Sequence, residues 1–252
     1  MLYVVGIGPG GEGYFTKKAE EILKNIDLIV CYKGYKKFVE RFNKPIYTTG
    51  MKKEIDRVDY ALKESKDKDV ALVSSGDATI YGLASLAYEL NEKKNYNIKI
   101  EVIPGITSAS SCSAILGSPL NHDFVVLSLS DLLTPLDIIL KRVKCALDGD
   151  FVITIYNPMS KSRKEPFLKA MEIVKEHAEK NNINYVVGIV KNASRENEEY
   201  KITTINELID NLEKYVEFID MNTTLIIGNS NTKVIDGKMV TPRGYLNKYK
   251  VE

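Results

Sequence analysis

Short apolar runs that alternate with amphipathic helical patterns constrain this chain more than any other feature. Runs such as LYVVGIG (2–8), DLIVCY (27–32) and DVALVSS are short, continuous and rich in aliphatic residues, as in strands buried on both faces. Between them lie segments with helical spacing, and KKEIDRVDYALKES (52–65) places Ile55, Val58 and Leu62 on one helical face. The alternation predicts an α/β fold with mainly parallel or mixed sheets.

The same alternation restarts after GSPLNHD (117–123). FVVLSLS and FVITIYNP are strand-like, PFLKAMEIVKEHAEKN is an amphipathic helix, and the strand patterns YVVGIV, KITTI and TTLIIG follow. Thr134-Pro135 predicts the start of the helix LDIILKRVKCAL, and Asp236-Gly237 predicts a hairpin. Because 252 residues suffice for two cores, we expect two α/β domains, 1–117 and 118–252.

Composition excludes several classes of partner. Lys and Arg (35) nearly balance Asp and Glu (34), so no global field favours nucleic acid or an anionic membrane. The apolar runs are shorter than a membrane span, and the chain starts in a strand pattern with no basic leader, which predicts a cytoplasmic protein. Three widely spaced cysteines and two histidines argue against a disulfide framework and against a metal held by the protein.

The first glycine-rich turn, VGIGPGG (5–11), matches G-x-G-x-x-G through Gly6, Gly8 and Gly11. A dinucleotide site must therefore be considered. Against it, the next helix is delayed to about Thr16, and the second strand ends in Tyr32-Lys33 instead of an acidic residue for the ribose. A purely structural glycine turn remains an alternative.

Two further turns follow strands in the same half. In SSGDATIYG (74–82), Asp77 is either the N-cap of a helix over TIYGLASLAYELNEKK or a ligand residue. In VIPGITSAS (102–110), Pro104-Gly105 leads into a helix of small residues, which allow close approach of one backbone to another or to a ligand. Turns at the carboxyl ends of strands in one sheet are expected to converge on one crevice.

Four stretches in order resemble a known family. GIGPGG, SGDATIYG, PGITSASSCSAILGSPLNHDF and TTLIIGNSNT are similar to motifs of the tetrapyrrole methylases, which use S-adenosylmethionine, and the resemblance covers nearly the whole chain. HDFVVLSLSDLLTP (122–135) and YNPMSKSR (156–163) resemble the branch that methylates C17 of cobalt-factor III or precorrin-3B, with ring contraction, in cobalamin biosynthesis. Whether the substrate carries cobalt stays open, and any cobalt would arrive inside the substrate.

The resemblance implies a homodimer of two-domain chains, with cofactor and substrate in a cleft between the domains, the glycine turn lining the substrate and S-adenosylhomocysteine as the product. The residues it places at the cofactor are Pro9, Gly76, Asp77, Ile80, Tyr81, Thr107, Ser108, Tyr156, Asn157, Ala193, and Thr223 or Thr224. His122-Asp123 is the candidate proton donor or acceptor for the rearrangement, with a hydrogen-bonded hinge as the alternative. Arg163, in the motif and in the basic cluster SKSRK, is the candidate partner for substrate carboxylates, as is Arg195.

A sulfonium methyl is already activated, so the chain need only hold the methyl and its acceptor in line and exclude water. Alternatives within the fold are a C11 or C20 ring methylase and a methylase of ribosomal RNA or diphthine. A non-catalytic sensor of S-adenosylmethionine is the alternative outside enzymes: it would keep the binding turns without needing His122 or Arg163.

Overall fold

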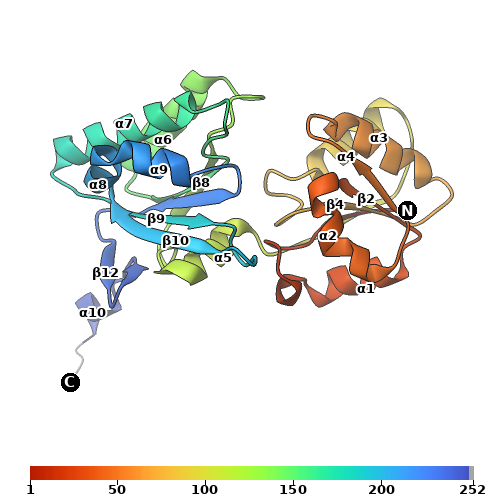
Figure 1. Cartoon of the computed structure of the whole chain (residues 1–252), viewed down its shortest axis with the longest axis horizontal. Coiled ribbons are helices and arrows are strands. Elements are labelled where there is room, and N and C mark those ends of the chain that lie inside the picture. Colours follow the sequence, from red (N-terminus) through yellow and green to blue (C-terminus); the bar gives the residue numbers. More distant parts are fainter. Residues whose placement is uncertain (250–252) are drawn as a thin grey trace. The chain divides into compact units, whose positions relative to one another are not determined.

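The computed structural model describes residues 1–249 and divides into two compact units, Met1–Ser108 and a second that begins at Ala109 (Figure 1). In the first unit all five strands are parallel, in the order β3-β2-β4-β1-β5. The strands are β1 (Leu2–Gly6), β2 (Leu28–Tyr32), β3 (Ile46–Thr49), β4 (Val70–Ser74) and β5 (Ile100–Ile103). The parallel sheet expected from the apolar runs is confirmed.

Helices cover both faces of this sheet. The apolar sides of α3 (Glu54–Glu64) and α4 (Ala84–Lys93) share one core cluster with strand residues such as Val4 and Leu72. On the other face, α1 (Lys17–Asn25) packs against residues that include Val5 and Val73. The short elements between strands are η1 (Glu12–Tyr14), η2 (Lys33–Tyr35), α2 (Lys36–Val39) and η3 (Glu40–Phe42).

Of the two helix starts expected in this unit, one is confirmed and the other is wrong. Thr16 caps α1 as expected, and its Oγ1 accepts a hydrogen bond of 3.1 Å from the Ala19 N–H. The helix expected from Thr79 is wrong in its first turn, because α4 begins at Ala84 and its N-cap is Leu83. Tyr81 has a left-handed φ of 52°. Asp77 is therefore not the N-cap of α4, and residues 78–83 form a turn.

The second unit has a mixed sheet in the order β10-β9-β11-β8-β7, parallel only between β7 and β8. Its strands are β7 (Phe124–Ser128), β8 (Val152–Tyr156), β9 (Val186–Lys191), β10 (Glu199–Thr204) and β11 (Thr223–Ile227). A small sheet is made of β6 (Gly117–Ser118), β12 (Lys233–Ile235) and β13 (Lys238–Val240). The expected hairpin joins β12 and β13, with left-handed φ angles at Asp236 and Gly237.

Helices also cover both faces of the mixed sheet (Figure 1). One face carries α6 (Leu136–Asp148), α7 (Glu165–Asn181), α8 (Ile205–Asp210) and α9 (Leu212–Phe218), and the other carries α5 (Ser108–Leu116). The start of α6 differs from the expectation by one residue, because its N-cap is Pro135 and not Thr134. A further short helix is α10 (Tyr245–Lys248). Across residues 1–249, no helix combines the length and the apolar character that a membrane span requires.

The helix α5 belongs with the second unit. Its Cys112 and Leu116 are fully buried in a cluster with Val190, Ile226 and Met239, all of the second unit. The chain therefore divides at the amino end of α5, ahead of the boundary expected after residue 117, because the apolar side of α5 is buried against the mixed sheet.

Candidate functional site

The three turns that follow β4, β1 and β5 lie beside one another, because these strands are neighbours in the parallel sheet. Gly8 and Gly76 exchange backbone hydrogen bonds: the Gly8 N–H donates to the Gly76 carbonyl (3.1 Å), and the Gly76 N–H donates to that of Gly8 (2.7 Å). Both glycines have left-handed φ angles, 75° and 67°. The convergence expected from the sequence is confirmed at the level of the backbone.

Gly6 and Gly105 pack against these turns with no room for a side chain. A Cβ on Gly6 would lie 2.7 Å from the Gly76 carbonyl oxygen and 2.8 Å from the Gly105 nitrogen. A Cβ on Gly105 would lie 2.7 Å from the Gly6 carbonyl carbon and closer still to the Gly76 carbonyl oxygen. These two glycines therefore serve close packing of one turn on another.

Asp77 links two of the turns through its carboxylate. Oδ1 accepts from the Thr79 N–H (2.7 Å) and hydroxyl (2.5 Å), and Oδ2 accepts from the Gly105 N–H (3.0 Å). Burial alone would raise the pKa of Asp77, but the hydrogen bonds from Thr79, Gly105 and Ile80 outweigh it, so the pKa lies below its ordinary value. Asp77 is 8% exposed and both of its carboxylate oxygens accept hydrogen bonds from the protein, so Asp77 shapes the site.

The side chains that these turns present outward are Ile80 and Tyr81, both exposed. A Cβ on Gly76 would have only the Thr107 Cα, at 3.9 Å, within 4 Å, so the surface over Gly76 is open. Pro9 follows Gly8 in the first turn, and Thr107 and Ser108 follow Gly105 in the third. Apolar side chains and open backbone at the carboxyl edge of a parallel sheet suit a small folded ligand.

In the second unit, three of the expected cofactor residues lie on the side of the sheet that faces α5. The Tyr156 hydroxyl accepts a 2.6 Å hydrogen bond from the Ala109 N–H, in the first turn of α5. Ala193 is buried in the cluster beneath α5, and the Thr224 side chain hydrogen-bonds the thiol of Cys112 on α5. Burial raises the pKa of this thiol to about 12, although the hydrogen bonds from Thr224 and Ser111 lower it.

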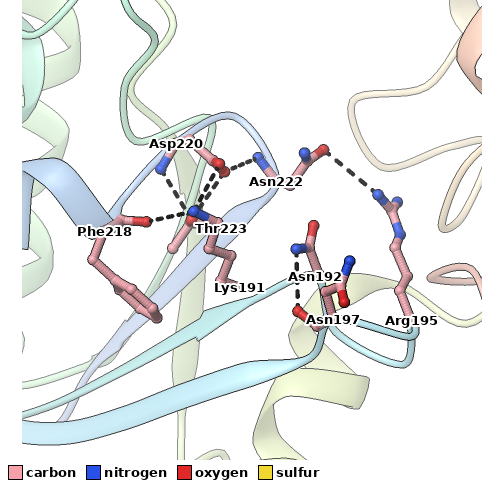
Figure 2. A network of polar contacts seen from close by, with 8 residues as sticks. All are labelled: Lys191, Asn192, Arg195, Asn197, Phe218, Asp220, Asn222 and Thr223. Carbon is pink, nitrogen blue, oxygen red and sulfur yellow. Dashed lines mark hydrogen bonds and ion pairs between the residues drawn. The ribbon is translucent and has the colours of Figure 1, made fainter.

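The Thr223 side chain lies on the face of the sheet opposite to Thr224 and forms hydrogen bonds with Asp220 (Figure 2). The Thr223 hydroxyl accepts from the Asp220 N–H (3.0 Å) and donates to Asp220 Oδ1 (3.2 Å), which also accepts from the Asn222 N–H (2.8 Å). Lys191 forms an ion pair of 3.1 Å with Asp220 Oδ2. The sequence left Thr223 and Thr224 as alternatives, and the geometry favours Thr224 because its side chain is on the face of Tyr156 and Ala193.

Asn157 and Arg163 join the loops that follow β7 and β8. Asn157 has a left-handed φ of 50° and donates from Nδ2 to the Ser128 hydroxyl (3.0 Å). Arg163 donates to the carbonyl oxygens of Leu129 (2.6 Å) and Asn157 (2.9 Å), and its Nε lies 3.8 Å from Asp131. Burial lowers the pKa of Arg163, partly offset by Asp131. Arg163 thus organises these loops, and its two terminal nitrogens are engaged by protein groups.

His122 and Asp123 lie between β6 and β7. The His122 side chain is 39% exposed, and its Nδ1 accepts a 2.8 Å hydrogen bond from the Asp123 N–H. The Asp123 carboxylate is exposed and lies 3.6 Å from the same nitrogen. With Nδ1 accepting, the neutral ring carries its proton on Nε2, the nitrogen left to exchange a proton with a ligand.

Two buried hydroxyls close in sequence to Tyr156 and Ala193 have no hydrogen-bond partner within residues 1–249. They are the Oγ1 of Thr154 and the Oγ of Ser194. Thr154 lies two positions before Tyr156 on β8 and shares its face, and Ser194 follows Ala193 with a left-handed φ of 60°. Buried side-chain hydroxyls are ordinarily hydrogen-bonded, so these two stand out among the residues around Tyr156 and Ala193. No sequence motif marks either hydroxyl, although a threonine within the apolar run FVITIY is a signal for Thr154.

The comparisons with known proteins all indicate the same family. The family model for tetrapyrrole (corrin/porphyrin) methylases matches residues 1–209. A probable cobalt-factor III C(17)-methyltransferase of Methanocaldococcus jannaschii is 74% identical, with all of both chains covered. The crystal structure of the methyltransferase CobJ has a TM-score of 0.87 and 30% identity over 96% of this chain and 99% of that one.

A uroporphyrin-III C-methyltransferase from Thermus thermophilus, solved with S-adenyl homocysteine, shares the fold with a TM-score of 0.65 at 18% identity, over 90% of this chain and 91% of that one. The family model covers well over half of the chain, and the M. jannaschii relative matches it from end to end. The chain belongs to the tetrapyrrole (corrin/porphyrin) methylase family.

Proposed function

We propose that the chain transfers a methyl group from S-adenosylmethionine to C17 of cobalt-factor III, with contraction of the macrocycle, in cobalamin biosynthesis. The observation that carries this proposal is the 74% identity, over the full length of both chains, to a relative named for that reaction. The likeness to the methyltransferase CobJ over nearly the whole of both chains supports it.

The proposed cofactor contacts in the first unit are the backbone of the three turns and the side chains of Ile80 and Tyr81. Asp77 and the glycine contacts hold this surface in place before the cofactor binds, which lowers the entropic cost of binding. In the second unit the proposed contacts are Tyr156, Asn157, Ala193 and Thr224, with the unpaired hydroxyls of Thr154 and Ser194 beside them. S-adenosylmethionine supplies a methyl group that needs no further activation.

The chain's own part in the reaction is orientation and control of one proton. Turns fixed by backbone hydrogen bonds hold a ligand in one position, which favours an in-line transfer. We assign the proton step to His122, because its Nδ1 accepts from the Asp123 N–H, which leaves Nε2 to exchange a proton with a ligand.

The remaining parts of the proposal concern assembly and partners. We propose a cytoplasmic homodimer that acts on a tetrapyrrole and on neither nucleic acid nor membranes. The near balance of 35 basic and 34 acidic residues supports this view of its partners, because nucleic-acid binding proteins carry an excess of positive charge.

The experiment that tests the function is an anaerobic incubation of the protein with S-adenosylmethionine and cobalt-factor III. Metal-free precorrin-3B and unmodified ribosomal RNA serve as parallel acceptors, and mass spectrometry and absorbance follow the products. We expect one added methyl and a changed chromophore with the cobalt ring and no methylation of RNA. If the protein binds S-adenosylhomocysteine yet methylates none of the rings, the C17 assignment is wrong. His122→Asn should keep cofactor binding and slow turnover, which also separates an enzyme from a sensor.

A further inference from the structure

Arg57 is a buried cation in the first unit with no carboxylate at hydrogen-bond distance among residues 1–249. It lies on α3 and is 4% exposed. Its Nη1 donates to the Thr49 hydroxyl (2.6 Å) and, at 3.4 Å, to the Gly50 carbonyl. The nearest carboxylate, that of Glu54, stands 3.7 Å from Nη2 and is itself half exposed. A guanidinium does not lose its proton in a protein, and a buried charge without a close counter-ion is costly.

The two nitrogens that lack hydrogen bonds are on the same edge of the guanidinium. Nε is buried and has no partner within the described chain, and Nη2 has only the long contact with Glu54. The N–H groups of Nε and Nη2 point in the same direction and together match the two oxygens of one carboxylate. Arg163 differs, because both of its terminal nitrogens donate to backbone carbonyl oxygens.

The surroundings of Arg57 place it where a ligand would bind. Thr49, its partner, is the last residue of β3 and pairs in register with Tyr32, the last residue of β2. These are carboxyl ends of parallel strands, the edge at which open α/β sheets bind ligands. The Tyr32 ring meets that of Tyr35 edge to face, with centroids 5.3 Å apart, so aromatic surface lies at the same end of β2.

A second cation lies nearby. Arg57 and Lys36 both act on the thiol of Cys31, the residue before Tyr32: burial raises its pKa to about 11, and the two cations oppose that rise. The carboxyl ends of β2 and β3 thus combine positive charge with aromatic rings. Few ligand chemistries match both features, and a flat conjugated ring with carboxylate arms is one of them.

We propose that Arg57 binds a carboxylate arm of the macrocyclic substrate through Nε and Nη2, and that it is a substrate-positioning residue of the enzyme. This inference rests on the proposed function, since it takes the substrate to be a tetrapyrrole with carboxylate arms. Bound in this way, the arm supplies the counter-ion that Arg57 lacks and fixes one edge of the ring at the carboxyl ends of β2 and β3. Glu54 competes for Nη2 when no ligand is present.

The test compares Arg57→Lys and Arg57→Gln with the matched control Lys53→Gln, which removes one exposed positive charge next to the start of α3. The Kd of cobalt-factor III is measured by absorbance titration, the Kd of S-adenosylhomocysteine by calorimetry, and folding by thermal unfolding. We expect both Arg57 variants to weaken ring binding about 10-fold or more, with cofactor binding within about 2-fold of wild type. Lys53→Gln should leave the Kd of the ring and the Kd of S-adenosylhomocysteine within about 2-fold of wild type. Glu54→Gln should tighten ring binding, because it removes the competing carboxylate.

A chemical version of the test uses the ring with its carboxylates converted to methyl esters. Esterification should cost the wild type more affinity than it costs Arg57→Gln, because the variant has already lost one carboxylate contact. An equal loss in both proteins, or unchanged ring binding in Arg57→Lys, would overturn the inference. If Arg57→Gln does not fold, Arg57→Lys carries the comparison. Failure of the wild type to methylate the ring would instead reject the proposed function, so the two failures are distinguishable.

Discussion

A hydrogen bond of 3.0 Å from the Gly105 N–H to Asp77 Oδ2 joins two turns whose residues are 28 positions apart in the chain. Because β1 lies between β4 and β5, this bond spans the turn that follows β1, and Gly6 is held between the two. The three turns are therefore positioned by one another as well as by their strands. A binding surface built in this way is rigid before a ligand arrives, which favours both affinity and in-line geometry.

Asp77→Asn is expected to loosen the turns. One side-chain oxygen can still accept from Thr79, but the new amide would face the Gly105 N–H, donor against donor. An unsatisfied buried donor costs about 1 to 3 kcal/mol. We expect a lower unfolding temperature and weaker binding of S-adenosylhomocysteine, measured by thermal unfolding and calorimetry. Because the pKa of Asp77 is lowered in the folded state, this stabilisation should fade as the pH falls through that pKa. Wild-type cofactor affinity in the variant would contradict the assignment of Asp77 to the shape of the site.

Gly105→Ala is expected to displace the turns outright. Its Cβ would collide with the backbone of Gly76 and Gly6, which cannot move without breaking the hydrogen bonds around them. We expect a destabilisation of about 3 kcal/mol and loss of cofactor binding, measured by denaturant unfolding and calorimetry. The control is Gly13→Ala, since nothing lies within 4 Å of a Cβ at Gly13. Equal behaviour of the two variants would show that the close packing of the turns is unimportant.

The strands β1, β2 and β4 could be predicted because they are buried on both faces and so are continuous apolar runs. The edge strand β3 was missed, because its residues, IYTT, are only partly buried and carry no apolar run. The glycine turns could be predicted because only glycine tolerates such close backbone contact at Gly6 and Gly105. The start of α4 could not be predicted, since the apolar pattern does not reveal the left-handed φ of Tyr81 or the hydrogen bond from the Thr79 N–H to Asp77.

The burial of Arg57 and the division of the chain into two units depend on tertiary contacts that no local pattern encodes. Arg57 was missed because an arginine within an amphipathic helix is ordinarily exposed, and its burial follows from packing against Thr49 and Gly50. The division of the chain into two units also could not be predicted, because the small residues of α5 could pack against the sheet of either unit. Only the packing of Cys112 and Leu116 assigns the helix to the second unit.

Thr223 and Thr224 are expected to respond differently to substitution by valine. Thr224→Val should weaken S-adenosylhomocysteine binding about 5-fold or more, because its hydroxyl is on the face of Tyr156 and Ala193. Stability should change little, because the hydrogen bond that is lost is the weak one with the Cys112 thiol. Thr223→Val should instead lower stability by about 1 to 3 kcal/mol, because it leaves the Asp220 N–H without a partner and removes one of the donors to the Asp220 carboxylate. Calorimetry and denaturant unfolding check the two effects. The reverse pattern would mean that Thr223 is the residue at the cofactor.

Asp59 is expected to make the first unit sensitive to acid. Its side chain is 14% exposed, and the carboxylate joins α3 to the end of α4 through contacts with Lys63 (2.8 Å), Lys94 (2.6 Å) and the Tyr96 hydroxyl (2.8 Å). Burial alone would raise the pKa of Asp59, but the hydrogen bonds from these three groups lower it to about 2. The folded-state pKa is below the unfolded value, so the stabilisation is complete above about pH 4 and is lost as the pH falls toward 2.

Asp59→Asn should therefore lower the free energy of unfolding by about 2 kcal/mol at neutral pH, and the difference from wild type should shrink between pH 4 and pH 2. Denaturant unfolding across that range measures it. The control is Asp56→Asn on the same helix, whose side chain is exposed and whose one ion pair among residues 1–249 is with Lys53, so its effect should be small. A difference between wild type and Asp59→Asn that stays constant down to pH 2 would show that the contacts with Lys63, Lys94 and Tyr96 do not depend on the charge of Asp59.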